Sequence, residues 1–299
     1  MNPALKKLGF GEKDRVVIIH TDDIGMCQST MPAYESLLDC GLISSASVMV
    51  PCPWFLETAR FCRAHPAADM GVHLTLNAEW ETYRWGPIST REVKSGMLDA
   101  QGYFFAKPQD TIQQANPAAV ATELKTQLER ALTAGIDVTH LDSHMGTVMH
   151  SPFLKLYIEL ALEYRLPLFL LKGTQASLTD LGVEAEQIEQ LIELTHELEE
   201  RGLPLFDALT MLPLDDPTDH ISRAKTLIDE LQPGLTYMIL HPAVDTPELR
   251  ACAPDWRSRV ANYEAFSSPE LRDYVRQSGV QVINYRQLRE LVRSRSFQN

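Results

Sequence analysis

Two adjacent carboxylates follow the first apolar run of the chain, and they are the first side chains whose types suit chemistry. RVVIIH, residues 15–20, is followed by Thr21, Asp22 and Asp23. Runs of this kind predict buried strands, and barrel enzymes collect their catalytic groups at the carboxyl ends of such strands. Adjacent Asp residues are also common in turns. The pair alone therefore leaves a catalytic site and a loop cap equally open.

Histidines occupy similar positions in later apolar runs. His73 lies in MGVHLTL, and VTHLDSH brings Asp142 and His144 to the end of the next predicted strand. Neutral imidazole and carboxylate oxygen suit Zn²⁺ and other divalent ions, and a set of Asp23, His73 and His144 leaves coordination positions for water and substrate. For one histidine alone, a hydrogen-bonded core position is the commoner explanation. Convergence of three such residues on one rim favours a metal site.

A further histidine suits proton transfer. His241 ends the run LTYMILHP, and the ordinary pKa of imidazole lies near neutrality. We expect His241 to be a general acid, and a capping or loop histidine before Pro242 is the alternative. His20 and His140 lie inside predicted strands, where we expect satisfied ring nitrogens. Three others are expected at the surface: His65, His196 and His220.

Short apolar runs alternate with longer segments of helical periodicity, which is typical of a parallel sheet covered by helices. The predicted strands are residues 15–20, 44–50, 70–76, 138–142, 166–170, 203–208, 235–240 and 280–284. The predicted helices are residues 31–40, 53–64, 118–134, 152–163, 185–201, 220–231, 269–277 and 286–294.

This alternation predicts an α/β fold of one domain over residues 1–299, a distorted (β/α) barrel with about seven or eight strands. A doubly wound open sheet is the alternative. Residues 77–116 interrupt the pattern with an irregular, aromatic-rich insertion. Long insertions are commonly functional, so we expect a lid or substrate wall near the rim, although the aromatic residues of a long loop more often build a small core of the loop itself.

The overall composition argues against several partners. The chain has 40 acidic and 27 basic residues and a formal net charge of -13, which disfavours nonspecific binding to nucleic acid or anionic lipid. Its apolar runs are far shorter than the ~20 residues of a membrane helix. The first fifteen residues lack the apolar stretch of a signal peptide, which predicts a cytoplasmic location. Five cysteines without a C-x-x-C pair are expected to be reduced.

Five separated motifs carry a family resemblance: HTDDIG, GLISSASVMV, GVHLTL, THLDSH and LHPAVDTPELR, followed by RVANYEAFSSPELRDYV. In these motifs, from about residue 15 to 290, the chain resembles the YdjC-like carbohydrate deacetylases of the ChbG/HpnK type. The resemblance implies a distorted (β/α) barrel, a divalent ion (Mg²⁺ or Zn²⁺) and removal of acetyl groups from N-acetylated sugars. It implies Asp23, His73 and His144 as metal ligands. It also implies Asp22 as general base and agrees with His241 as general acid.

One motif departs from the family pattern. Many relatives read D-x-H-x-H-x-H after the fourth strand, whereas Gly146 and Val148 stand here at the second and third histidine positions. The implied metal ligands are retained, but the sugar-facing surface is expected to differ, so a chitooligosaccharide is not assumed as substrate. The resemblance also includes an arginine in the last long loop. Arg257 and Arg259 could therefore support the site, and solvated surface charge explains them equally well.

The expected function is hydrolysis of the N-acetyl amide of an amino sugar or oligosaccharide to free amine and acetate. Another metal-dependent amidohydrolase or phosphoesterase on the same barrel is one alternative. A non-catalytic sugar-binding protein is another, and the presence of both an expected base and an expected acid argues against it. A homo-oligomer is expected by analogy alone, because barrels often pair.

Overall fold

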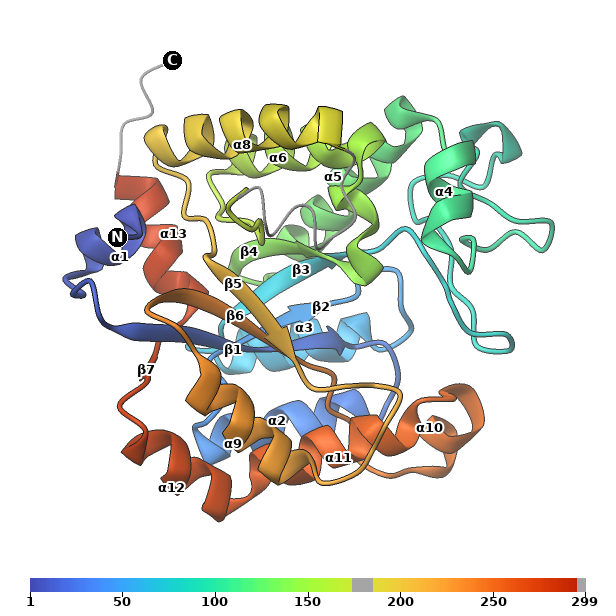
Figure 1. The fold of residues 1–299 in the computed structure, drawn as a ribbon. Coiled ribbons are helices and arrows are strands. Elements are labelled where there is room, and N and C mark those ends of the chain that lie inside the picture. Colours follow the sequence, from blue (N-terminus) through green and yellow to red (C-terminus); the bar gives the residue numbers. More distant parts are fainter. Residues whose placement is uncertain (174–184, 295–299) are drawn as a thin grey trace.

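The computed structural model describes residues 1–173 and 185–294, and its centre is a sheet of parallel strands (Figure 1). The strands are β1 (Arg15–Ile24), β2 (Ser45–Val48), β3 (Met70–Leu74), β4 (Val138–Ser143), β5 (Ala208–Met211), β6 (Gly234–Leu240) and β7 (Gln281–Val282). Their order is β4-β3-β2-β1-β6-β5, and β7 pairs with the beginning of β1. The predicted α/β class is therefore confirmed.

Backbone bridges close the gap between the two ends of this sheet. Leu141 of β4 pairs with Leu168, and Leu171 pairs with Phe206 just before β5. The N–H of Phe206 donates to the carbonyl of Leu170 at 3.0 Å. The segment predicted as a strand over residues 166–170 thus joins β4 to β5 through single bridges. The result is a distorted barrel, not the open sheet of the alternative.

Helices surround the barrel, and all eight predicted ones are present within about two residues of their expected bounds. They are α2 (Thr30–Cys40), α3 (Phe55–Ala64), α5 (Pro117–Thr133), α6 (Ser151–Tyr164), α8 (Ala185–Glu200), α9 (His220–Glu230), α12 (Pro269–Gln277) and α13 (Tyr285–Ser294). The described residues form four more helices that were not predicted: α1 (Pro3–Leu8), α4 (Pro108–Gln114), α10 (Pro247–Cys252) and α11 (Trp256–Ser267). The predicted strand over residues 203–208 was also misplaced, since β5 begins only at Ala208.

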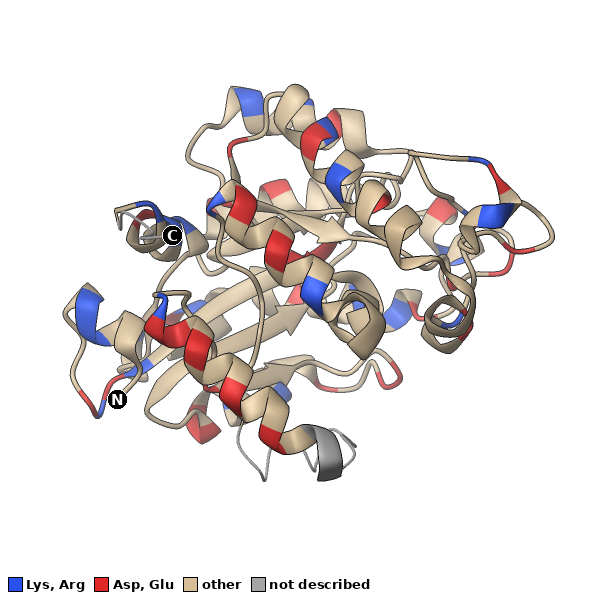
Figure 2. Ribbon diagram, turned by 90° about the horizontal axis from the view of Figure 1, so that it is seen from above, with Lys and Arg blue, Asp and Glu red and all other residues tan. Residues whose placement is uncertain are grey.

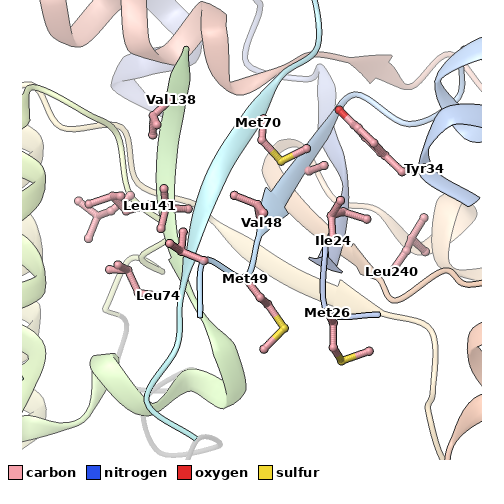
Figure 3. Packing of buried hydrophobic residues seen from close by; sticks show 14 of the residues in the cluster. Ile24, Met26, Tyr34, Val48, Met49, Met70, Leu74, Val138, Leu141 and Leu240 are labelled. Carbon is pink, nitrogen blue, oxygen red and sulfur yellow. The ribbon is translucent and has the colours of Figure 1, made fainter. Parts of the chain in front are cut away.

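Two buried clusters fill the molecule, because successive strand side chains point to opposite faces of the sheet. Val17 and Ile19 of β1 belong to the larger, outer cluster between the strands and the helices. Figure 3 shows part of this cluster around β1 to β4, with the Tyr34 side chain of α2 packed beside the sheet. Val16 and Ile18 belong to the smaller cluster inside the barrel. Burying both faces of β1 explains its nearly continuous apolar sequence.

The insertion after β3 packs its buried aromatic side chains into the outer cluster. It contains a short 3₁₀ helix, η1 (Val93–Ser95), and α4, and it lies beyond the carboxyl ends of the strands (Figure 1). Trp85 and Phe104 are buried, and the indole N–H of Trp85 donates to the carbonyl of Asn77 at 2.7 Å. Trp85 and Phe104 therefore belong to the outer cluster and not to a separate core of the insertion.

Acidic side chains mark the exposed face of α8 (Figure 2). Glu189, Glu193, Glu197 and Glu200 recur at helical spacing and are exposed. This face adds to the negative net charge of -13 that the sequence carries. No helix in the described part of the chain is long and apolar enough to cross a membrane.

Candidate active site

The first carboxylate pair lies within β1, not after it as the sequence suggested. In a regular strand Asp22 and Asp23 would point to opposite faces of the sheet. Asp23 instead has a left-handed backbone with φ 63°, and the pairing of β1 with β2 shifts register between Thr21 and Ile24. This local irregularity lets both carboxylates reach the same pocket.

Asp23, His73 and His144 come together from three parts of the barrel rim. His73 lies in β3, and His144 begins the short 3₁₀ helix η2 (His144–Met149) that follows β4. Oδ1 of Asp23 is 3.4 Å from Nε2 of His73 and 3.2 Å from Nδ1 of His144. All three residues are buried, and their ligand atoms lie within 4.8 Å of one another.

A carboxylate stands behind each of these histidines. Nδ1 of His73 is 2.7 Å from Oδ1 of Asp142, and Nε2 of His144 is 2.9 Å from Oε2 of Glu79. The carboxylate accepts a hydrogen bond from the ring nitrogen that carries the proton. The other ring nitrogen of each histidine is then free to bind an ion. Asp142 was recognised from its strand-end position. Glu79 was missed, because it lies in the irregular insertion.

The donor set fits a divalent cation. Oδ1 of Asp23 is buried and has no hydrogen-bond partner within the described residues, although two ring nitrogens face it. An unpaired buried oxygen is costly unless a cation or donor satisfies it. Burial would raise the pKa of Asp23, but Arg259 and the two histidines hold it well below its usual value, so the carboxylate is ionised. Two imidazoles and one carboxylate suit Zn²⁺ and other divalent ions.

Arg259 supports the outer side of Asp23. Its Nη1 donates to Oδ2 of Asp23 at 2.7 Å, its Nε donates to Asp255 at 2.9 Å, and its guanidinium lies 5.4 Å from the ring centroid of Trp80. It is buried and belongs to α11. Arg257, the other arginine of that segment, is exposed and packs on the ring of Trp256.

His241 follows β6 directly and faces the other carboxylate. Its Nε2 lies 3.6 Å from Oδ2 of Asp22, and its Nδ1 is buried without a hydrogen-bond partner among the described residues. Its backbone N–H donates to the side chain of Asn262 at 3.0 Å. Burial lowers the pKa of His241, although Asp23 and Asp22 act in the opposite direction. The imidazole is therefore neutral at pH 7.

The remaining histidines differ in part from expectation. His65 and His196 are exposed as predicted, but His220 is buried, with Nε2 2.8 Å from the carbonyl of Asp216. It begins α9 and packs against Asn262 of α11, a helix that was not predicted. His20 and His140 are fully buried, yet Nδ1 of His20 and Nε2 of His140 lack hydrogen-bond partners in the described part of the chain. Their ring nitrogens are thus only partly satisfied.

The pocket above these residues has a volume of about 420 Å³. Glu79 and Trp80 of the insertion line one side of it. Apolar side chains of η2 and β5 line another side, and Met145, Leu209 and Met211 are 40 to 52% exposed there. Gly146 lines the pocket beside them and adds no side chain there. The candidate ion ligands and His241 therefore share the pocket with an apolar wall.

Comparisons with known proteins give a family and several relatives of this chain. The model of the family described as YdjC-like protein matches residues 16–277. A carbohydrate deacetylase of Thermus thermophilus is 35% identical over 269 residues, 90% of this chain and 92% of that protein. A carbohydrate deacetylase of Brevibacillus brevis is 26% identical over 274 residues, 91% of this chain and 99% of that protein.

A solved structure has the same fold. It is that of an Enterococcus faecalis V583 protein to which cellobiose-phosphate cleavage has been ascribed, with a TM-score of 0.76 and 22% sequence identity. The match covers 92% of this chain and 99% of that one. The family match confirms the expected YdjC-like family. The curated relatives are named as carbohydrate deacetylases, which is the enzyme class expected from the sequence. With a family model that spans most of its length, the chain belongs to the YdjC-like family.

Proposed function

We propose that this protein is a divalent-metal-dependent deacetylase that hydrolyses the N-acetyl group of an amino sugar or oligosaccharide to free amine and acetate. The observation that carries the proposal is the unpaired buried oxygen of Asp23, which faces one ring nitrogen each of His73 and His144. The carboxylates behind these histidines direct the nitrogens toward it. The names of the curated relatives supply the substrate class, an acetylated carbohydrate.

Asp23, His73 and His144 would hold the ion, which we propose to be Mg²⁺ or Zn²⁺. When bound, such an ion polarises an amide carbonyl and lowers the pKa of water. Arg259 holds the second oxygen of Asp23, so only Oδ1 is directed toward the two histidines. The protein thereby orients a single carboxylate oxygen toward the ion.

Asp22 and His241 would transfer protons. Asp22 acts as the general base that takes a proton from the attacking water. Neutral His241 must gain a proton before it can act as an acid, and its Nε2 lies 3.6 Å from Oδ2 of Asp22. This distance is longer than a direct hydrogen bond, so a small approach of the two groups would pass the proton to His241, which then donates it to the departing amine. One proton thus passes from water to nitrogen through two side chains.

The decisive experiment is acetate release from N-acetylated mono- and oligosaccharides, with cyclic amides and phosphoesters as a second panel. Chelated protein is restored separately with Zn²⁺, Mg²⁺, Mn²⁺ or Co²⁺. We expect acetate from sugars only in the presence of an ion. Turnover of cyclic amides or phosphoesters alone would replace the proposal with the broader hydrolase function, and sugar binding without any turnover would point to a non-catalytic protein.

Asp22→Asn separates the base from the metal ligands. We expect kcat to fall by about 10²- to 10⁴-fold, the usual contribution of a general base, while the ion content is unchanged. Ion content is measured by elemental analysis of the purified variant. An Asp22→Asn enzyme with ordinary kcat would remove Asp22 from the role of base.

A further inference from the structure

The barrel interior below the candidate metal ligands is lined by polar side chains. The proposed reaction uses the residues at the rim and gives no role to those below it. His20, Ser47, His140 and Asp142 are buried there, with exposed fractions of 0 to 2%. The interior of a (β/α) barrel is ordinarily filled by apolar branched side chains, as it is around Val16 and Ile18 lower in this barrel. Buried polar groups are costly, so a cluster of them beneath an active site calls for an explanation.

His20 is the centre of this cluster. Along β1 it shares one face of the strand with Val16, Ile18 and Asp22, because every second side chain points the same way. Its ring therefore lies in the layer directly below the site. Its Nε2 is 3.1 Å from Oδ1 of Asp22 and 3.0 Å from Oδ2 of Asp142. The same nitrogen is 3.1 Å from Oγ of Ser47. One imidazole nitrogen therefore contacts the two carboxylates that flank His73.

Neighbouring rings keep the imidazole of His20 in place. The ring of Tyr237 lies 4.9 Å away and that of His140 5.1 Å away, measured between centroids. The hydroxyl of Tyr237 also donates to Oδ2 of Asp142 at 3.1 Å. His140 in turn stacks on Tyr285 with a centroid distance of 3.7 Å. Such packing leaves His20 no room to turn away from the carboxylates.

The two oxygens of each carboxylate face different partners. Oδ1 of Asp142 binds His73, whereas its Oδ2 contacts His20. Oδ1 of Asp22 contacts His20, whereas its Oδ2 lies toward His241 and His73, at 3.6 and 3.9 Å. Oδ1 of Asp22 is buried and has no aligned hydrogen bond within the described residues, and Nε2 of His20, at 3.1 Å, is the polar atom beside it.

We propose that His20 is a positioning residue for the deacetylation: it holds one oxygen of Asp22 so that the other is directed toward the reacting water. This inference rests on the proposed function, in which Asp22 is the general base. Through Asp142, the same imidazole links the base to the carboxylate that orients His73. His20 itself contacts neither substrate nor ion.

Two amide variants test the reach of this contact. In His20→Gln the side-chain NH₂ takes the position of Nε2 and still reaches both carboxylates, whereas in His20→Asn an amide of the same polarity is too short. We expect His20→Gln to keep kcat within about fivefold of the unmodified enzyme. We expect His20→Asn to lose about 10- to 100-fold in kcat, part of the contribution of a general base, with KM within about twofold and unchanged ion content.

Ser45→Ala is the matched control. Ser45 is buried in β2 directly beside His20 in register, but its hydroxyl donates to Asp69 at 2.9 Å and not to the site. Its loss is expected to lower thermal stability without changing kcat. Equal losses of kcat in the Gln and Asn variants, or none in either, would overturn the positioning role.

Crystal structures of the two variants test the inference without reference to turnover. The Asp22 carboxylate is expected to keep its orientation in His20→Gln and to rotate in His20→Asn, and an unmoved carboxylate in both would refute the proposal. If His20→Asn does not fold, a displaced Asp22 in His20→Gln overturns the proposal and an unmoved one with retained kcat supports it. If the unmodified enzyme releases no acetate, the proposed function is wrong. The orientation of the Asp22 carboxylate in the two variants would then still test whether His20 positions it.

Discussion

Asp23 combines three constraints that are seldom met by one side chain. Its backbone is left-handed, its Oδ2 accepts from Arg259, and its Oδ1 faces His73 and His144 without a hydrogen bond from any described residue. Left-handed geometry is tolerated by Asp more readily than by bulky residues, and strain of this kind tends to persist at functional sites. The residue thus presents one oxygen to the site while the other is held by an ion pair.

Glu79→Gln tests the carboxylate behind His144. The amide is a weaker acceptor for Nε2–H, so the ring is less firmly oriented, and we expect the dissociation constant of the ion to rise about 10- to 100-fold. Isothermal titration with Zn²⁺ measures the change. Glu81→Gln is the control, because Glu81 is exposed on the same loop and should bind the ion normally. Unaltered affinity of Glu79→Gln would exclude the orienting role.

Ion binding should release protons. Although burial lowers it, Glu79 and Asp23 raise the pKa of His144 to about 9, and Asp142 and Asp22 raise the pKa of His73 well above its usual value. Both rings are therefore protonated in the metal-free protein at pH 7, and an ion binds only their neutral forms. We expect affinity to increase from pH 6 to 9, by about tenfold per unit for each proton released. Titrations in buffers of different ionisation enthalpy count the protons, and a pH-independent affinity would contradict this protonation state.

At the scale of elements, β3 is adapted to the polar layer inside the barrel. Gly71 lies against the ring of His140, and a Cβ atom at that position would come within 2.5 Å of the ring. The ring cannot retreat, because it is buried and stacked on Tyr285. Close approach of side chain and backbone explains a glycine in the middle of a strand.

Gly71→Ala should therefore destabilise the protein. We expect a loss of about 1 to 3 kcal/mol in the free energy of unfolding, the usual cost of overpacking a core. Chemical denaturation provides the measurement. At Gly11 the nearest atom to an added Cβ lies at 3.6 Å, in ordinary contact, so Gly11→Ala should change stability by no more than about 0.5 kcal/mol. Equal stability of both variants would show that the His140 ring can move.

The helix α11 shows what periodicity alone misses at this scale. It brings Arg259 to Asp23 and Asn262 to the backbone of His241. Its buried side chains include the polar residues Ser258, Arg259 and Asn262, so no apolar stripe marks its inner face. Helices are predicted from such stripes, and α11 lacks one because it packs against the active site.

For the whole molecule, the candidate ion site joins segments that are far apart in sequence. Its expected ligands come from β1, β3 and the beginning of η2, all at one rim of the barrel. An ion that binds only the folded protein stabilises it by mass action, by about 2.7 kcal/mol at 100 times its dissociation constant. In a domain of this size, such a gain corresponds to a rise in Tm of roughly 4 °C.

Thermal unfolding with and without Zn²⁺ measures this coupling. The unmodified protein should show the rise in Tm, and His144→Ala should lose it, because that variant lacks one of the three expected ligands. His196→Ala is the control, since His196 is exposed on α8, outside the pocket, and its removal should leave the gain intact. A Tm that does not respond to any divalent ion would contradict a structural link between ion and barrel.

Local patterns in the sequence determined most of the elements and the five side chains closest to the candidate ion site. Helix bounds followed from periodicity, because the spacing of apolar residues reports which side of a helix is buried. Asp22, Asp23, His73, His144 and His241 were found because parallel strands bring their carboxyl ends to one rim. Neither inference requires knowledge of contacts between distant segments.

Only the tertiary structure decided which groups support these five side chains. Glu79 is 65 residues from His144 and Arg259 is 236 residues from Asp23, and each reaches its partner through an irregular insertion or an unpredicted helix. The link of His20 to Asp142 and the single bridges that close the barrel arise in the same way. Such contacts depend on how separate segments fold back on one another, and the spacing of residues along one segment carries no record of that.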